Sequence, residues 1–191
     1  MTEKEKMLAG LPFDMDDPEI EADRSAAGDL CMELNNTRPS DLNTRNEILK
    51  RLLPSLKERF HILSPFHVEL GYNVIFGDSP LINYGQTIID YAPVTIGDNA
   101  FIGPRACFNT LVDDLTPEMK DGSKPFALPI TIGKNVWFGS EVKVCAGVTI
   151  GSGCVIGAGS VVTTDIPDNC LAAGDPARVI RSLEPDSLIG R

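Results

Sequence analysis

The chain has 191 residues, 42% of them hydrophobic, which is enough apolar material for one domain with a small appendage. It begins MTEKEKMLAG, without the core of a signal peptide, and no stretch is apolar enough to cross a bilayer, so we expect a cytoplasmic protein with no membrane partner. The net charge of -10 argues against nucleic acid as a partner, because like charges repel. The five cysteines are scattered and form no C-x-x-C pair, which predicts reduced thiols.

Two amphipathic helices are predicted near the N-terminus. Asp17 is a suitable N-cap, a proline fits the first turn after it, and an apolar stripe predicts a helix over residues 18–34. A second helix is predicted over residues 44–53, where Pro54 stops it. Neither helix carries a catalytic pattern. We expect residues 1–60 to form a helical hairpin that covers one end of the remaining chain.

A six-residue period follows. Large apolar side chains recur at every sixth position from Ile132 to Val162, and most are followed by glycine. This period is typical of a solenoid in which each hexad makes one flat face of a triangular coil, with its first residue pointing inward. The period is looser from Leu70 onward and shifts by two residues at Pro93–Val94. We therefore predict an all-β solenoid over residues 61–172.

The period is interrupted once and then ends. Residues 109–129 are largely polar and contain three prolines, which predicts a loop inserted at one corner of the solenoid. Such loops are often functional, although a loop that only packs against a neighbouring subunit is the alternative. Residues 173–191 are predicted to form a cap and a tail, with a turn at Gly174–Pro176 and a short helix from Ala177 to Leu183.

Several phrases of the sequence carry a family resemblance. They are VTIGDNAFIGP, then the inserted loop, then PITIGKNVWFGSEVKVCAGVTIGSGCVIGAGSVVTTDIP and AAGDPARVIR. Together with the N-terminal MTEKEKMLAG and GYNVIFG, they resemble the hexapeptide-repeat acetyltransferases of the maltose and galactoside O-acetyltransferase type over nearly the whole chain. The resemblance implies a left-handed parallel β-helix, a homotrimer, acetyl-CoA as the donor, a small-molecule acceptor and a site between adjacent subunits.

The chemistry that the resemblance implies needs a base. Removing the proton of an attacking hydroxyl is typically worth about 100- to 10,000-fold in rate. In the family this base is a histidine of the inserted loop, and an alignment without gaps places Asp113 at its position. The chain's two histidines, His61 and His67, do not align with it. With a pKa of about 4, an ordinary aspartate is a weaker base than imidazole.

Two hypotheses therefore stay open. The first is an O-acetyltransferase of small sugars or related hydroxyl compounds, with Asp113 as its catalytic residue and with reduced or altered activity. The second is an inactive trimer that retains CoA or ligand binding. Lys124, in SKPFALP, suggests an ion pair with Asp113 in place of a histidine-carboxylate pair.

The remaining site residues are implied by the same resemblance. Acceptor binding falls on four polar positions: Asn83, Glu69, Asp90 and Asp14. Donor binding falls on small residues of the coils and on positions near the nucleotide phosphates: Ser140, Ala158, Gly159, Thr163, Thr164 and Arg178. At Thr164 the family has a lysine, so the chain lacks one positive charge there. Trp137 matches a family tryptophan, and an outward aromatic in a subunit interface is the alternative.

Metal chemistry is not expected. Carbonic anhydrases with the same type of solenoid bind zinc through three histidines, and this chain has two in the wrong segment. The sequence also contains no P-loop, no dinucleotide fingerprint and no Ser-His-Asp pattern. We therefore expect acetyl-CoA as a co-substrate and no metal.

Overall fold

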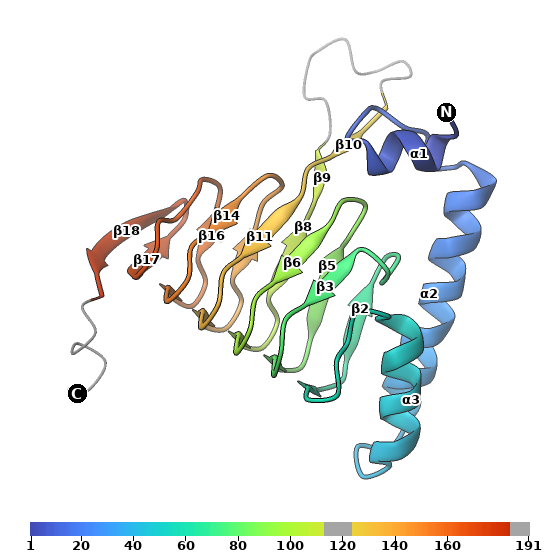
Figure 1. Cartoon of the computed structure of the whole chain (residues 1–191), viewed down its shortest axis with the longest axis horizontal. Coiled ribbons are helices and arrows are strands. Elements are labelled where there is room, and N and C mark those ends of the chain that lie inside the picture. The colour runs from blue at the N-terminus through green and yellow to red at the C-terminus, as the bar shows by residue number, and fades with distance from the viewer. Residues whose placement is uncertain (113–123, 184–191) are drawn as a thin grey trace.

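The computed structural model of the chain describes residues 1–112 and 124–183. In these residues the chain forms a prism of short strands, with helices at its N-terminal end and a hairpin at the other end (Figure 1). The core runs along the prism axis as one continuous apolar cluster. The predicted all-β solenoid of parallel strands with N-terminal helices is confirmed.

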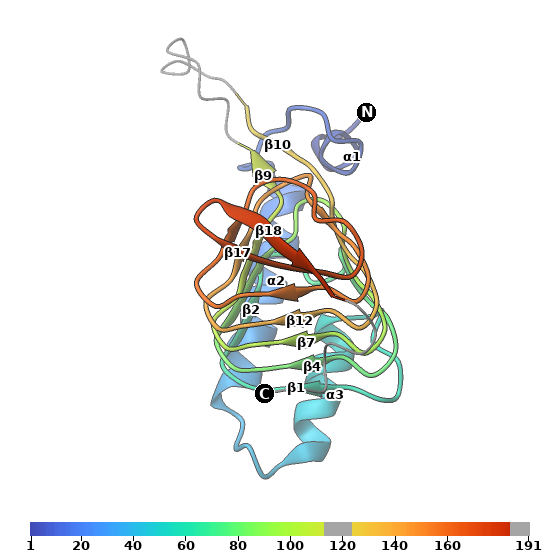
Figure 2. The same cartoon turned by 90° about the vertical axis from the view of Figure 1, so that its left-hand side faces the viewer.

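The prism has three faces, and each strand pairs in parallel with the strand one coil further on. Face A, whose strands are stacked in Figure 2, contains β1 (His61–Ile62), β4 (Leu81–Ile82), β7 (Phe101–Ile102), β12 (Trp137–Phe138), β15 (Val155–Ile156) and β17 (Cys170–Gly174). Face B contains β2 (Phe66–Val68), β5 (Gln86–Ile89), β8 (Cys107–Asn109), β13 (Lys143–Val144) and β16 (Val161–Val162). Face C contains β3 (Val74–Phe76), β6 (Val94–Ile96), β11 (Ile130–Ile132) and β14 (Thr149–Ile150).

The three corners of the prism differ in regularity. Six residues separate one inward residue from the next at every A–B and C–A corner, as from Ile102 to Phe108. All departures from six lie at the B–C corner. There the steps are eight residues from Val68 to Phe76 and from Ile88 to Ile96, 24 from Phe108 to Ile132, six from Val144 to Ile150 and four from Val162 to Ile166.

The start of the period differs from the prediction. Leu70 was expected to point inward, but Val68 is the inward residue and pairs with Ile88. Leu70 instead belongs to a second apolar cluster, which also contains Phe13 and Tyr91. The shift at Pro93–Val94 is the second of two eight-residue corners, and the period alone could not place the first of them.

The glycines that follow inward residues allow the coils to stack closely. A Cβ added to Gly103 would lie 2.6 Å from the carbonyl oxygen of Gly139 on the next coil. Because neighbouring strands lie only about 4.8 Å apart, the turn has no space for a side chain at this position. The repeated glycine therefore reflects contact between coils.

The N-terminal cap has three helices: α1 (Glu3–Leu8), α2 (Pro18–Asn36) and α3 (Leu42–Leu52). The side chain of Asp17 caps α2 as predicted, by accepting a hydrogen bond from the N–H of Glu19. Helix α1 was not predicted from the sequence. The pairing of α2 with α3 confirms the helical hairpin, whereas the division of the chain at residues 60 and 172 stays a prediction.

The cap binds the open strand edges of the first coil. The Asn35 amide accepts a hydrogen bond from the N–H of Phe66 at 2.9 Å and donates one to its carbonyl at 3.0 Å. The Ser55 hydroxyl donates to a carbonyl of β3 at 2.6 Å, and Arg45 donates to a carbonyl of β1 at 3.3 Å. Each face of the prism thus has at least one backbone group of its first edge bonded to the cap, and a covered edge is less open to pairing with another chain.

The opposite end is closed by a hairpin. β17 pairs antiparallel with β18 (Ala177–Ser182), so the short helix predicted from Ala177 to Leu183 is wrong. The segment contains Val179 and Ile180, whose branched side chains favour strands. The open edge of the last strand of face A therefore gains a partner.

The inserted segment leaves and returns at the B–C corner. Its two ends pair antiparallel as β9 (Leu111–Val112) and β10 (Phe126–Ala127). The N–H of Phe13 donates to the carbonyl of Pro125 at 3.0 Å, and α1 packs against β10. The N-terminal segment and the base of the insertion therefore lie side by side (Figure 1).

Candidate functional site

The first polar group of the B–C corner is built around Asp90. Asp90 is completely buried, and its carboxylate accepts the backbone N–H groups of Glu69 at 3.1 Å, Leu70 at 2.9 Å and Gly71 at 2.7 Å. Burial raises the pKa of Asp90, while these hydrogen bonds act in the opposite direction. This position gives Asp90 no open surface, so it supports the turn that carries Glu69. As an acceptor ligand, Asp90 stays a prediction.

Glu69 is partly exposed, and the hydroxyl of Tyr91 links it to Arg24 through two hydrogen bonds that were not predicted from the sequence. The hydroxyl of Tyr91 donates to the Glu69 Oε2 at 3.1 Å, and the Arg24 guanidinium donates to the same hydroxyl at 3.4 Å. The Tyr91 ring is buried, with its centroid 5.7 Å from that of Phe13. The position of Tyr91 next to Asp90 at an irregular corner was a sequence signal that could have pointed to its role. Nothing in the sequence distinguished Arg24 from the other charged residues of its helix.

Asp14 lies at the base of the insertion. The Lys124 ammonium is 3.3 Å from the Asp14 carboxylate and 3.5 Å from that of Glu3. Asp113 lies outside the described residues, so the pairing of Lys124 with it stays a hypothesis. Within the described residues, the acidic partners of Lys124 belong to the N-terminal segment.

Asn83 lies on the opposite edge of face B, at the A–B corner. It follows β4 directly, is half-buried, and its side-chain oxygen accepts a hydrogen bond from the N–H of Tyr84 at 2.9 Å. Glu69 follows β2 at the far end of face B. The width of a face therefore separates these two predicted acceptor residues within one chain.

The predicted donor residues also divide between the two edges of face B. Ser140, Ala158 and Gly159 lie at the A–B corner, where the N–H of Gly159 donates to the Ser140 carbonyl at 2.8 Å. Exposed Arg178, in β18, pairs with Ala173, which lies beside Gly157 at the same corner. Thr163 and Thr164 are exposed after β16, at the B–C corner.

Face A carries an outward apolar ladder. Trp137 is 49% exposed, and its ring stacks on that of Phe101 at a centroid distance of 5.5 Å. Outward His61 of the first coil is followed, in register from coil to coil, by the apolar residues Leu81, Phe101, Trp137, Val155 and Leu171. A continuous exposed apolar surface of this kind is typical of association surfaces.

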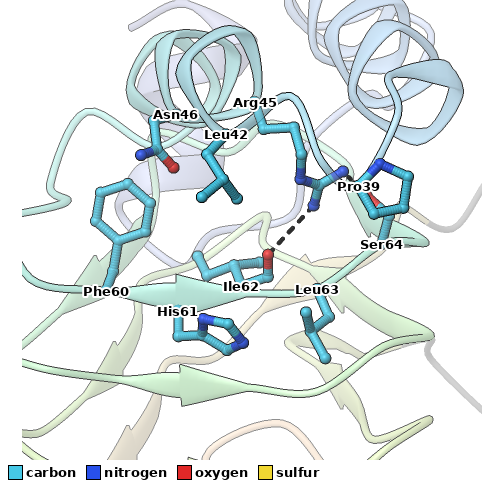
Figure 3. A pocket seen from close by; sticks show the side chains of 9 residues that line it. All are labelled: Pro39, Leu42, Arg45, Asn46, Phe60, His61, Ile62, Leu63 and Ser64. Atoms are coloured by element: carbon cyan, nitrogen blue, oxygen red, sulfur yellow. Dashed lines mark hydrogen bonds between the residues drawn. The ribbon is translucent and has the colours of Figure 1, made fainter.

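The histidines lie near the cap. His61 lines a cleft of about 260 Å³ between α3 and β1, together with Arg45 and Phe60 (Figure 3). The Arg45 guanidinium donates there to Ser64 Oγ at 2.8 Å, in addition to the β1 carbonyl. His67 points outward on face B, 3.4 Å from the Asn35 amide nitrogen. Within residues 1–112 and 124–183, neither imidazole hydrogen-bonds to a predicted site residue.

Three further features bear on function. The described part of the chain contains no group of three or more His, Cys, Asp or Glu side chains placed to hold a metal ion. None of its helices has the length and the apolar character needed to span a membrane. All five cysteines are free thiols, three of them buried and two half-buried.

Comparison with known proteins identifies the family. Residues 6–57 match the maltose acetyltransferase hexapeptide capping motif, residues 93–110 the hexapeptide repeat of succinyl-transferase, and residues 129–164 the bacterial transferase hexapeptide with six repeats. Galactoside O-acetyltransferase of Escherichia coli is 40% identical over 81% of this chain and 76% of its own length.

Solved structures agree with this assignment. A maltose O-acetyltransferase from Clostridium difficile superposes with a TM-score of 0.94 at 35% identity, over 96% of this chain and 98% of its own. A hexapeptide-repeat acetyltransferase of Vibrio cholerae, crystallised with acetyl coenzyme A, gives a TM-score of 0.88 at 39% identity, over 96% and 100%. The likeness confirms the predicted left-handed β-helix. The chain therefore belongs to the hexapeptide-repeat acetyltransferases of the maltose and galactoside O-acetyltransferase type.

Proposed function

We propose that this protein transfers the acetyl group of acetyl-CoA to a hydroxyl of a small sugar or a related compound, at a site that two subunits of a homotrimer share. The observation that carries the proposal is the division of the predicted residues between the A–B and B–C corners. One copy cannot bring both edges of its own face B together, whereas a second copy placed against it can. Closed symmetry is the usual arrangement of soluble homo-oligomers, and the threefold form is the one that the family resemblance implies.

The proposed trimer has a surface to form it. The apolar ladder of face A exposes Trp137 and Leu81, at 49% and 37%, and association would remove them from water. The outward residues of face C offer no such ladder, since most of them are threonines: Ile75, Thr95, Thr131 and Thr149. Face A is therefore our candidate for the contact between copies.

The donor side supports acetyl-CoA. Small residues at the A–B corner leave the backbone open to a narrow chain such as pantetheine, and exposed Arg178 at the end of this corner suits the nucleotide phosphates. The relative from Vibrio cholerae was crystallised with acetyl coenzyme A. Thr163 and Thr164 would add hydroxyl contacts from the other edge.

The acceptor side supports a hydroxyl compound. Asn83 offers an amide that can orient a hydroxyl or a carbonyl without titrating, and Glu69 and Asp14 offer carboxylate oxygens. Asp90 would act through the turn it supports. Such groups bind polyhydroxyl molecules through several hydrogen bonds.

The chemical step requires a base near the acceptor hydroxyl. The hydroxyl oxygen attacks the thioester carbonyl carbon, the base takes the hydroxyl proton, the C–S bond breaks, and the sulfur of CoA receives a proton. Asp113 remains our proposal for this base, and its low basicity is the reason to expect reduced or altered activity. This aspartate also favours the second candidate, a trimer that binds CoA without transfer.

One experiment separates the two candidates. The purified protein is incubated with acetyl-CoA and a panel of glucosides, galactosides and amino sugars, while free CoA thiol and acetylated product are measured. Transfer above the rate without protein supports the enzyme, and CoA binding without transfer supports the second candidate. In the variant Asp113→His, a large gain in transfer would identify a weakened catalyst, and a loss of existing transfer would identify a carboxylate mechanism.

The cytoplasmic location stays a prediction.

A further inference from the structure

Glu69 is fixed by two contacts of its backbone and by one contact of its carboxylate. Its backbone N–H donates to Asp90 and to the carbonyl of Ile88, each at 3.1 Å. Its side-chain Oε2 accepts the hydrogen bond of Tyr91 at 3.1 Å. The second oxygen, Oε1, has no hydrogen-bond partner within residues 1–112 and 124–183, and the residue is partly exposed. The corner thus presents one oriented and open carboxylate oxygen.

Tyr91 is itself held in place. The residue is 1% exposed and its ring packs beside Phe13, so the hydroxyl has little freedom to move. The Arg24 guanidinium donates to this hydroxyl at 3.4 Å, which leaves the hydroxyl proton directed at Glu69. Burial raises the pKa of Tyr91, so the phenol stays protonated at neutral pH and remains a donor.

We propose that Tyr91 is a positioning residue for acetyl transfer, whose hydroxyl, bound to Arg24, orients Glu69 so that the open carboxylate oxygen accepts a hydrogen bond from a hydroxyl of a neutral acceptor. The inference rests on the proposed function and narrows its acceptor class. The positive charge of Arg24 lies one hydroxyl away from Glu69. Arg24 would repel a cationic amine at this position, whereas a neutral polyhydroxyl compound carries no charge that could be repelled.

A neighbouring pair shows what a purely structural version of this contact looks like. The hydroxyl of Tyr72 donates to Asp23 Oδ2 at 2.9 Å, which also joins α2 to the first coil. The Asp23 carboxylate is in addition bound by the Lys4 ammonium at 2.7 Å. Asp23 is therefore neutralised by a direct ion pair, while no lysine or arginine within the described residues forms one with Glu69.

This contrast supplies a matched control. Tyr91→Phe keeps the ring against Phe13 and removes only the hydroxyl, and Tyr72→Phe removes a similar hydroxyl that does not touch Glu69. We expect Tyr91→Phe to raise the KM for the sugar acceptor about 5-fold, the value of one hydrogen bond, with the KM for acetyl-CoA unchanged. Both variants lose one tyrosine hydroxyl, so we expect them to lower the melting temperature by similar amounts. Tyr72→Phe should leave both KM values unchanged. Equal KM values for the two variants would overturn the proposal.

A double-mutant cycle tests the contact itself. If Tyr91 acts through Glu69, the acceptor KM of Tyr91→Phe combined with Glu69→Gln should equal that of Glu69→Gln alone. Independent, multiplying effects would contradict the proposal. Wild-type protein should also prefer glucosides and galactosides to their amino-sugar counterparts at neutral pH, and a preference for the protonated amines would overturn the acceptor class.

The geometry can be read without turnover, which separates this inference from the proposed function. With tyrosines labelled at Cζ, Glu69→Gln should shift the NMR resonance of Tyr91 at neutral pH and leave that of Tyr72 in place. If this shift occurs but wild-type protein transfers no acetyl group, the proposed function fails while the contact stands. If transfer occurs but the Tyr91 resonance does not respond, the positioning role fails.

Discussion

The A–B and B–C corners bound the same face of the prism, yet they differ in almost every respect. At the A–B corner the step is six residues in every coil, and small residues such as Ser140 and Gly159 occupy it. At the B–C corner the step varies from four to 24 residues, and charged and aromatic side chains such as Glu69 and Tyr91 gather there. A regular edge suits a ligand that lies along the prism axis. An irregular edge allows individual charged and aromatic side chains to be held in separate, specific positions.

Breaking the regular corner should give the largest effect. Gly103→Ala would place a Cβ 2.6 Å from a backbone oxygen of the next coil, and the backbone cannot move away without disturbing the strand pairing. We expect a loss of about 3 kcal/mol in the free energy of unfolding, measured by denaturant titration.

The control for this variant is Gly28→Ala. Gly28 lies in α2, and a Cβ there would meet nothing within 4 Å. Alanine favours a helix, so this variant should be stabilised by up to about 1 kcal/mol. A Gly103→Ala protein as stable as the wild type would show that the coils do not stack as closely as the structure has them.

The second prediction concerns the need for two copies. Asn83→Ala and Glu69→Ala should each lower transfer strongly, because each removes one edge of the shared site. Co-expressed in equal amounts with different tags, the two variants should regain about a quarter of wild-type transfer, the fraction of sites with both intact edges in a randomly mixed trimer. Steady-state transfer by the purified mixed assembly is the measurement.

As the control, the two variants are purified separately and mixed under conditions in which the trimers do not exchange subunits. If the mixed assembly stays at the level of the single variants, the two edges belong to different sites or act within one chain. The trimer proposal would then need another arrangement of copies.

The regular half of this comparison could be read from the sequence, and the irregular half could not. The hexads from Ile132 to Val162 predict which face each residue belongs to and which residues point inward, because each coil repeats the same contact with its neighbour. The sequence has no comparable rule for the B–C corner. Leu70 continues the six-residue spacing in the printed sequence but leaves the axis in the structure, since the corner there contains two additional residues.

The candidate site divides in the same way. Small donor positions such as Ala158 follow from the repeat, and the structure places them at one corner as their spacing requires. The contact of Arg24 with Tyr91 joins residues 67 positions apart through helix packing, which no local pattern records. The wrong prediction of a helix from Ala177 to Leu183 has a similar origin. The segment's local pattern does not record the open edge of β17, and pairing with that edge makes the segment a strand.

The third prediction sharpens the donor part of the comparison. Thr164→Lys would restore the positive charge that the family resemblance implies at this exposed position of the B–C corner. A charge-assisted contact should lower the KM for acetyl-CoA about 5-fold, with the acceptor KM unchanged, and added salt should weaken this gain. Thr164→Gln provides a neutral side chain of similar reach as the control. A gain shared by both variants would assign the effect to length rather than charge.

The smallest effect concerns the attachment of the N-terminal segment at the irregular corner. Hydrogen bonds from Lys6 and from the N–H of Asp14, with the charge of Lys124, lower the pKa of Glu3 from 4.5 to about 2. A lowered pKa in the folded state means that this stabilisation is present above pH 4.5 and is lost as the pH falls towards 2. Glu3→Gln should therefore melt about 1 °C below the wild type at pH 7, and the difference should vanish near pH 2. Exposed Glu21, replaced by glutamine, is the control, and a difference for Glu3→Gln that does not change with pH would contradict this attachment.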